Sequence, residues 1–179
     1  KDFGKLKEAE LSYRKAIENK PDFAMAHSNL GNVLKDLDNL QEAFDSYLKV
    51  IDINPKLSNI YASITRFLKE SDVSQLNKSK LKDILNLLLE RNDVTHKELI
   101  KAFNFLYSNQ LITSLEKIDS DFSEIELLIN DKVIMNALKK ITFKDIKLEN
   151  VLINVRKYLC SKITKRKEEI SYSKLQLII

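Results

Sequence analysis

Residues 5–21 of this chain reappear 34 places later as residues 39–55. Eight of the seventeen positions carry the same amino acid: Leu6 and Leu40, Glu8 and Glu42, Ala9 and Ala43, Ser12 and Ser46, Tyr13 and Tyr47, Lys15 and Lys49, Ile17 and Ile51, and Pro21 and Pro55. A period of 34 residues is typical of stacked helical pairs, in which each unit buries its apolar face only against its neighbours. The period therefore predicts a helical array with a concave binding face, and it carries no evidence of catalysis.

The residues kept by the repeat have separate physical roles. Gly31 and Ala43 have little or no side chain, so the two helices of a pair can approach closely, and Gly31→Leu is expected to destabilise the pair by about 1 to 3 kcal/mol. Tyr47 and its counterpart Tyr13 are expected to bury their rings while the hydroxyl reaches a partner at the edge. Pro55 ends the second helix, because proline lacks the amide donor and disfavours a helical residue before it.

Seven residues of the complete copy follow the spacing W-x-x-L-G-x-x-Y, A-x-x-x-F, P, namely His27, Leu30, Gly31, Leu34, Ala43, Tyr47 and Pro55. On these residues the chain resembles the tetratricopeptide repeat family. It departs from the family pattern at four positions: His27 replaces Trp, Leu34 replaces Tyr, Val50 replaces a small residue and Asp38 replaces the turn Gly. The resemblance implies a solenoid of helical hairpins that binds a protein or peptide partner on its concave face.

The array is short in this sequence. A third copy begins at Ser58, but the spacing of its second helix is not recognisable. We therefore expect a half repeat, one full repeat and a half repeat in residues 1–72, followed by a helical linker or adaptor domain in residues 73–179. Because the first copy starts near its turn, at Gly4, we also expect further repeats upstream, whose number the sequence leaves open.

The second domain keeps helical periodicity without the 34-residue period. Its apolar stripes are Leu81, Ile84, Leu85 and Leu88; Leu99, Phe103 and Leu106; Leu111, Leu115 and Ile118; Val133, Ala137, Leu138 and Ile141; and Leu148, Val151, Leu152, Val155, Leu159 and Ile163. Thr95-x-x-Glu98 predicts a capping box at the start of one helix. Two glycines and two prolines leave few breaks. We expect an all-α chain: the end of a repeat solenoid followed by a nonrepeat helical domain.

A weaker resemblance concerns two segments of the second domain. Residues 130–140 and 148–156 are similar to a helical linker of bacterial methyltransferases that combine tetratricopeptide repeats with an S-adenosylmethionine-dependent domain. This resemblance implies an alternative function, the noncatalytic recruitment region of such an enzyme. Since Gly4 and Gly31 are the only glycines, the glycine-rich turn that lets a backbone approach the cofactor is absent, and we expect no cofactor in this sequence. A methyltransferase domain would have to lie beyond it.

Residue types that commonly carry catalysis are scarce. Cys160 is the only cysteine, which excludes an internal disulfide and a cysteine-based zinc cluster, and its neighbours predict a buried thiol. His27 takes a packing position of the repeat, while His96 lies in the first turn of a predicted helix, and neither has metal-ligand spacing with a second ligand. We assign no catalytic residue and no metal ligand, and we expect this sequence not to be an enzyme.

The distribution of charge and hydropathy along the sequence argues against nucleic acid and membranes as binding partners. Of the 30 basic and 26 acidic side chains of the sequence, residues 1–75 hold 11 basic and 12 acidic ones. Residues 76–179 hold the other 19 basic and 14 acidic side chains, so the basic excess belongs to the second half. The basic cluster from Arg156 to Lys167 lacks regularly interleaved aromatic residues and is followed by Glu168 and Glu169, so nucleic-acid binding is not expected. No run of roughly 20 apolar residues predicts a membrane span, and the N-terminal residues do not have the layout of a secretion signal. We expect a cytoplasmic protein of undetermined oligomeric state.

The predicted binding residues lie on the first helix of each pair, between the positions that carry the core. They are Met25, Ser28, Asn29, Asn32 and Asp36 in one copy and Asn59, Ser63, Arg66 and Glu70 in the next. Asn amides both donate and accept, so Asn29 and Asn32 are expected to hold a peptide backbone without demanding a particular side chain. Because Arg66 and Glu70 have opposite charges, a strongly basic clamp for a C-terminal carboxylate is disfavoured. The identity of the partner stays open.

Overall fold

The computed structural model describes residues 2–117, 127, 130–141, 150, 153, 155–157 and 160. Its regular elements are α1 (Phe3–Asn19), α2 (Ala24–Asp36), α3 (Leu40–Ile53), α4 (Ser58–Glu70), the 3₁₀ helix η1 (Val73–Gln75), α5 (Lys78–Glu90), the 3₁₀ helix η2 (His96–Leu99), α6 (Ile100–Lys117) and α8 (Lys132–Lys140). None of these described elements is a strand. The expected all-α class, helical hairpins followed by further helices, is confirmed.

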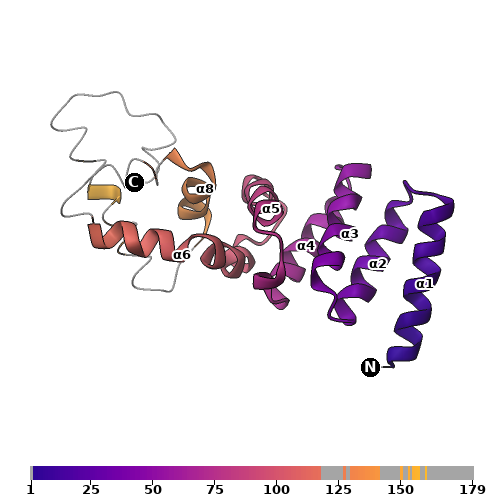
Figure 1. The fold of residues 1–179 in the computed structure, drawn as a ribbon. Coiled ribbons are helices and arrows are strands. Elements are labelled where there is room, and N and C mark those ends of the chain that lie inside the picture. The colour runs from indigo at the N-terminus through magenta and orange to yellow at the C-terminus, as the bar shows by residue number, and fades with distance from the viewer. Residues whose placement is uncertain are drawn as a thin grey trace.

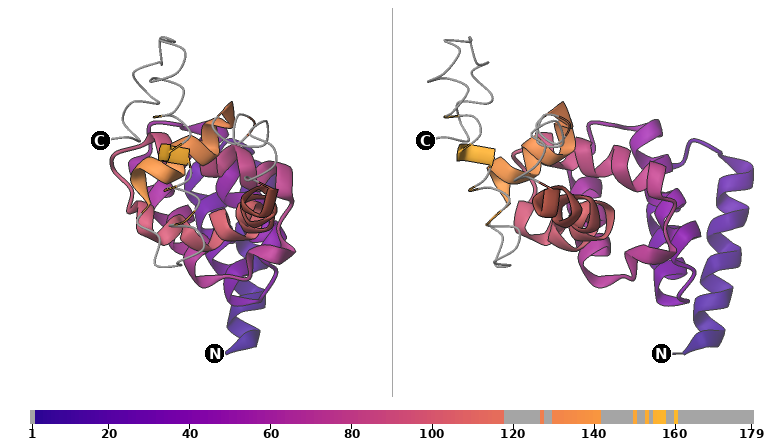
Figure 2. Two further views of the ribbon diagram at one scale, coloured as in Figure 1. Left: turned by 90° about the vertical axis from the view of Figure 1, so that its left-hand side faces the viewer. Right: turned by 60° about the vertical axis from the view of Figure 1, so that its left-hand side comes forward.

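The helices are arranged in a row along an elongated molecule. Figure 1 shows α1 to α4 standing beside one another at the N-terminal end, with α5, α6 and α8 following toward the other end. The right-hand view of Figure 2 shows the same order, with α1 as the outermost helix. The tightest packing is between α2 and α3, and α1 packs against α2. Contact between successive helices is the arrangement that a repeat array requires.

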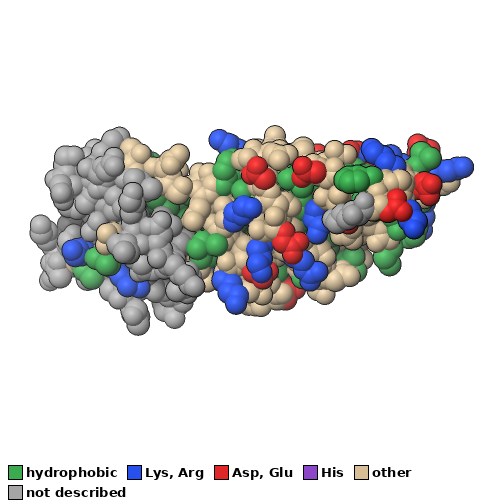
Figure 3. Space-filling view, turned by 90° about the horizontal axis from the view of Figure 1, so that it is seen from below, with side chains coloured by type: hydrophobic (Ala, Val, Ile, Leu, Met, Phe, Trp, Pro, Cys, Tyr) green, Lys and Arg blue, Asp and Glu red, His purple; other side chains and the backbone are tan. Residues whose placement is uncertain are grey.

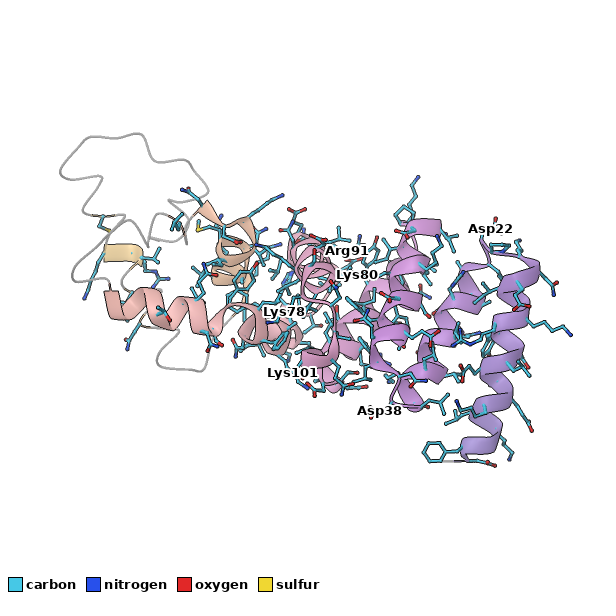
Figure 4. The ribbon with its side chains drawn as sticks, in the orientation of Figure 1. Asp22, Asp38, Lys78, Lys80, Arg91 and Lys101 are labelled. Carbon is cyan, nitrogen blue, oxygen red and sulfur yellow. The ribbon has the colours of Figure 1, made fainter. Side chains whose placement is uncertain are left out.

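The turn from α2 to α3 is built on a left-handed residue. Asp38 has a φ of 65°, and it is the non-glycine residue with a positive φ in the described part of the chain. The Asn39 N–H donates to the Leu34 carbonyl at 2.9 Å, and the Asp38 N–H donates to the Lys35 carbonyl at 3.1 Å. These two bonds form a Schellman motif, in which glycine is the usual left-handed residue. Asp38 occupies the position of the family's turn glycine, at the lower end of α2 in Figure 4.

The side chain of a ring-containing residue in α2, and of another in α4, forms a hydrogen bond to the loop before its helix. His27 Nε2 lies 2.9 Å from the Pro21 carbonyl oxygen. One period later, the Tyr61 hydroxyl donates to the Pro55 carbonyl oxygen at 2.7 Å. Two side chains of different chemistry therefore satisfy the same carbonyl, which explains how this position accepts His in one copy and Tyr in the next. The helices α1 and α3 both end two residues before a proline, as predicted.

The core is centred on the contact between α2, α3 and α4. Tyr47 is 1% exposed, and its ring packs edge-on against Phe67 with 5.4 Å between the centroids. Phe44 stacks on Phe67 at 6.0 Å. A Cβ atom on Gly31 would lie 2.6 Å from a Tyr47 ring carbon, so only glycine fits there without displacement. The predicted close approach at Gly31 is confirmed, and buried residues continue as one cluster from Leu30 to Val155.

A helix follows α4 where no second helix of the third copy was recognisable in the sequence. The backbone N–H of Asn77 donates to Gln41 Oε1 at 2.7 Å, and Lys80 Nζ lies 2.7 Å from Asp45 Oδ1. These pairs join residues 36 and 35 places apart, so α5 lies along α3 at nearly one repeat period. However, α5 packs more closely on α8 and α6 than on α4. The domain boundary at residue 72 stays a prediction.

One local expectation for the second half is wrong. Thr95 precedes η2 without a side-chain cap bond, and the Glu98 carboxylate instead accepts from Lys69 Nζ at 2.9 Å, so no capping box forms. Phe103, Leu106 and Leu111 all lie on α6, which neither glycine nor proline interrupts, while Leu99 lies in η2 and Ile118 lies outside the described residues. The stripe of α5 and the one beginning at Val133 are buried as predicted. Most of residues 148–163 lies outside the described residues.

Candidate partner-binding face

The nine predicted binding residues reach the surface on two helices, α2 and α4, and we call this surface the α2–α4 face. Met25, Asn32, Asn59, Arg66 and Glu70 are exposed, while Ser28, Asn29, Asp36 and Ser63 are half-buried. Their spacing of three and four residues places each set along one side of its helix. None of the nine is enclosed in the core, which is what contact with a partner requires. Their role in binding stays a prediction.

An ion pair joins the two helices on this face. Lys35 Nζ of α2 lies 3.2 Å from Glu70 Oε2 of α4, and both side chains are partly exposed. Such exposed pairs stabilise a fold by about 0.2 to 1 kcal/mol, so the bridge positions the helices more than it stabilises them. Sequence reasoning predicted Glu70 but missed Lys35. The sequence signal that could have indicated this pair is the opposite charge of Lys35 and Glu70 at a separation of 35 residues, nearly one repeat period.

The side chain of Asn32 is held in one orientation by α3. The Tyr47 hydroxyl donates to Asn32 Oδ1 at 2.8 Å. With its oxygen engaged by Tyr47, the amide keeps its NH₂ group as the free donor on an exposed residue. The predicted ring burial and edge hydroxyl contact of Tyr47 are both confirmed. Tyr47 therefore connects the packing of the repeat to the chemistry of the α2–α4 face.

The Tyr47 hydroxyl that donates to Asn32 is protonated at neutral pH. Burial, together with the nearby carboxylates of Asp36 and Glu70, raises the pKa of Tyr47 to about 12. The hydroxyl is accordingly protonated at neutral pH and always has a proton to donate. It can therefore donate to Asn32 Oδ1, as the structure shows.

Two more amides lie on the face with their hydrogen-bonding groups unused. The side chains of Asn29 and Asn59 make no hydrogen bond to another part of the described chain, and only the backbone carbonyl of Asn59 is engaged, by the Ser63 hydroxyl at 3.0 Å. Together with the NH₂ group of Asn32 they offer both donors and acceptors. Extended peptide backbones present both kinds of group as well.

A small cavity, which we call the end pocket, lies where the face meets the segment after α5. It has a volume of about 310 Å³ and is lined by Ala62, Thr65, Arg66, Lys69 and Glu70 of α4 and by Asp93, Val94, Thr95 and Glu98. The Arg91 guanidinium lies 3.6 Å from the ring centroid of Tyr61 and fixes the start of this segment against α4, near the Arg91 label in Figure 4. Nothing in the repeat pattern predicted this wall, because residues 91–98 lie outside the period.

Other hollows lie between second helices and are lined by ion-paired residues. One of about 480 Å³ lies between α1 and α3, where Arg14 pairs with Glu42 at 2.6 Å. Another of about 460 Å³ lies between α3 and α5, beside the Asp45–Lys80 pair. Each of these two hollows thus has one ion pair among the side chains that line it. Figure 3 shows acidic and basic side chains interspersed over the middle of the molecule seen from below.

The candidate catalytic groups are placed apart. His27 and His96 each contact a backbone carbonyl, His96 Nε2 lying 2.8 Å from the Arg91 oxygen. Cys160 is exposed, so the prediction of a buried thiol is wrong. The nearby Val155 is buried, but residues five positions apart on a helix point in different directions, so its burial does not extend to Cys160. No group of three His, Cys, Asp or Glu side chains converges within the described part of the chain. Its helices include none with both the length and the apolarity to cross a membrane.

Comparison with protein families identifies the repeat. A model described as TPR repeat matches residues 2–38, and one described as tetratricopeptide repeat matches residues 26–57. No curated protein matches the chain significantly. The two matches overlap over residues 26–38, which include most of α2, and the second ends in the loop after α3. They support the family resemblance for residues 2–57, while the methyltransferase-linker resemblance has no such support.

Proposed function

We propose, from the tetratricopeptide repeats of residues 2–57, that this chain is a protein-interaction scaffold that binds an extended peptide segment of its partner on the α2–α4 face. Repeats of this kind generally mediate protein–protein interaction, and solenoids commonly bind along their concave surface. The proposed function is noncatalytic and needs no cofactor.

One observation carries the proposal: the exposed Asn32 amide is held by Tyr47 so that its NH₂ group stays free. An amide fixed before binding loses less side-chain entropy when it donates to a peptide carbonyl. Asn29 lies nearly one helical turn before Asn32 and adds a second amide on the same side. The pair can recognise backbone groups, which every partner sequence contains, so the peptide's side chains must supply specificity elsewhere.

The experiment compares peptide binding by wild-type protein and by Asn29→Ala/Asn32→Ala on an array of random peptides. Loss of two hydrogen bonds, each contributing about 0.5 to 1.5 kcal/mol, is expected to weaken binding on the order of tenfold. The matched control is Asn109→Ala/Gln110→Ala, which removes two exposed amides of α6. Circular dichroism must show unchanged helicity in both variants. Equal binding by wild type and the Asn29→Ala/Asn32→Ala variant would exclude the α2–α4 face as the binding surface.

The recruitment region of a methyltransferase remains only a prediction. Residues 132–140 of the first resembling segment form α8, whose buried Val133, Ala137 and Leu138 have a packing role. No observation among the described residues favours this function over the scaffold. Reading the coding sequence after Ile179 would test it, because a strand, a glycine-rich turn and an acidic residue about 20 places on would indicate the cofactor-binding domain.

A further inference from the structure

The acidic groups that line the end pocket all have cationic partners. The pairs are Glu70 with Lys35 at 3.2 Å, Glu98 with Lys69 at 2.9 Å, and Asp93 with Arg91 at 2.5 Å. Each pair joins a pocket carboxylate to a cation on α2, α4 or the segment after α5. The carboxylates are therefore largely neutralised by neighbouring cations, and they repel an incoming anion less than their number suggests.

One charged group of the pocket has no such partner. Arg66 is exposed on α4 and makes no hydrogen bond or ion pair to any residue that the structure describes. The hydroxyl of Thr95, on the opposite wall, is likewise unused, because it makes no cap bond to η2. The pocket thus presents a planar guanidinium and a hydroxyl donor, and no acceptor among the described residues occupies either.

The remaining walls suit a short aliphatic stem. Ala62 and Val94 line the pocket with methyl groups, and Val94 is half-buried against the core. The Arg91–Tyr61 stacking holds this segment on α4, so the wall is fixed and not a loose loop tip. A guanidinium binds a carboxylate through two parallel N–H bonds, which are stronger than bonds between neutral groups.

We propose that the end pocket binds the side-chain carboxylate of an Asp or Glu residue of the partner peptide. Arg66 donates two hydrogen bonds to the carboxylate, Thr95 donates a third, and Ala62 and Val94 contact the methylene groups. The inference rests on the proposed function, and it adds the side-chain specificity that backbone recognition by Asn29 and Asn32 lacks. It also places the acidic residue at the α4 end of the α2–α4 face, nearest to residues 93–98.

The test uses a library of N-acetylated, C-amidated random peptides, so that no terminal carboxylate is present, with Glu, Gln or Lys fixed at one position at a time. Wild-type protein is expected to prefer Glu over Gln at one position by about tenfold, the effect of losing one charge-assisted contact. Arg66→Gln should abolish the preference, and Arg66→Glu should shift it toward Lys at that position. The control Lys49→Gln removes an exposed cation of α3 and should leave the preference unchanged.

The possible outcomes separate the two proposals. Peptide binding without a Glu preference, or a preference that persists in Arg66→Gln, overturns the acidic subsite while leaving the scaffold function standing. A preference lost equally in Arg66→Gln and Lys49→Gln also overturns it, because the cause would then be overall charge. Failure of wild-type protein to bind any peptide of the library overturns both proposals.

Discussion

Replacing Gly31 by Ala separates helix propensity from tertiary packing, because the two effects have opposite signs. Gly31 lies inside α2, where alanine is favoured over glycine by about 1 kcal/mol. Against this, the added Cβ would lie 2.6, 2.8 and 3.0 Å from three ring carbons of Tyr47. Helix propensity alone would make Gly31→Ala more stable than the wild type, whereas the contact with the Tyr47 ring would make it less stable.

The magnitude follows from how firmly the Tyr47 ring is held. The ring is 1% exposed, packs on Phe67 and is tied through its hydroxyl to Asn32. Displacing it costs about 1 to 3 kcal/mol for overpacking and about 1 kcal/mol for the strained hydrogen bond. After the propensity gain of about 1 kcal/mol is subtracted, Gly31→Ala should lower the free energy of unfolding by about 1 to 3 kcal/mol.

Urea denaturation followed by circular dichroism measures this change. The matched control is Gly4→Ala, because a Cβ there meets only Asp2 Oδ1 at an ordinary 3.4 Å, and stability should not fall. In a Tyr47→Leu background the ring is gone, so Gly31→Ala should become neutral or stabilising. The reasoning would be refuted if Gly31→Ala left wild type as stable as before, or if its cost were the same in the Tyr47→Leu background.

Three further predictions concern single residues around the same helices. Phe67→Ala should destabilise the fold by about 3 to 5 kcal/mol in thermal or chemical denaturation, because the ring is 1% exposed and contacts both Phe44 and Tyr47; a loss under 1 kcal/mol would contradict this core. Asp38→Gly should stabilise by about 0.5 to 1 kcal/mol in the same assay, since glycine adopts a φ of 65° without steric cost, and a decrease would contradict the turn geometry. The pKa of Tyr47 is raised from 10.0 to about 12, which adds stability that is present below pH 10 and is lost as pH rises through about 12. The free energy of unfolding of the wild type should therefore fall relative to that of Tyr47→Phe between these pH values. An equal change with pH in the two proteins would contradict the prediction.

Much of the repeat could be predicted from the sequence because its determinants are local and periodic. The prolines that follow α1 and α3, the glycine beneath Tyr47 and the stripe of α5 act within a few residues or at one period, and the structure places them as predicted. The third copy was harder to recognise: α5 lies beside α3, but η1 intervenes between α4 and α5, and α5 does not keep the Ala and aromatic spacing of α3.

Some features of the α2–α4 face and the end pocket could likewise be predicted from the sequence, and others could not. Asn29, Asn32, Arg66 and Glu70 could be placed on the surface by counting along a helix, since helical geometry fixes which side a residue takes. The Lys35–Glu70 bridge needed the distance between α2 and α4, which no local pattern supplies. Thr95 and Glu98 were misread as a capping box, because the nearby ammonium of Lys69 competes for the carboxylate that a cap would use.

By itself the sequence determined the helices, their pairing at the N-terminal end and the side of α2 and α4 that faces outward, because propensity, turn chemistry and a fixed period act over short distances. Only the tertiary structure decided that Tyr47 orients the Asn32 amide and that residues 93–98 close a pocket around Arg66. These contacts join segments 15 to about 30 residues apart. Their geometry depends on how complete helices pack against one another, and that packing is not encoded at any single position.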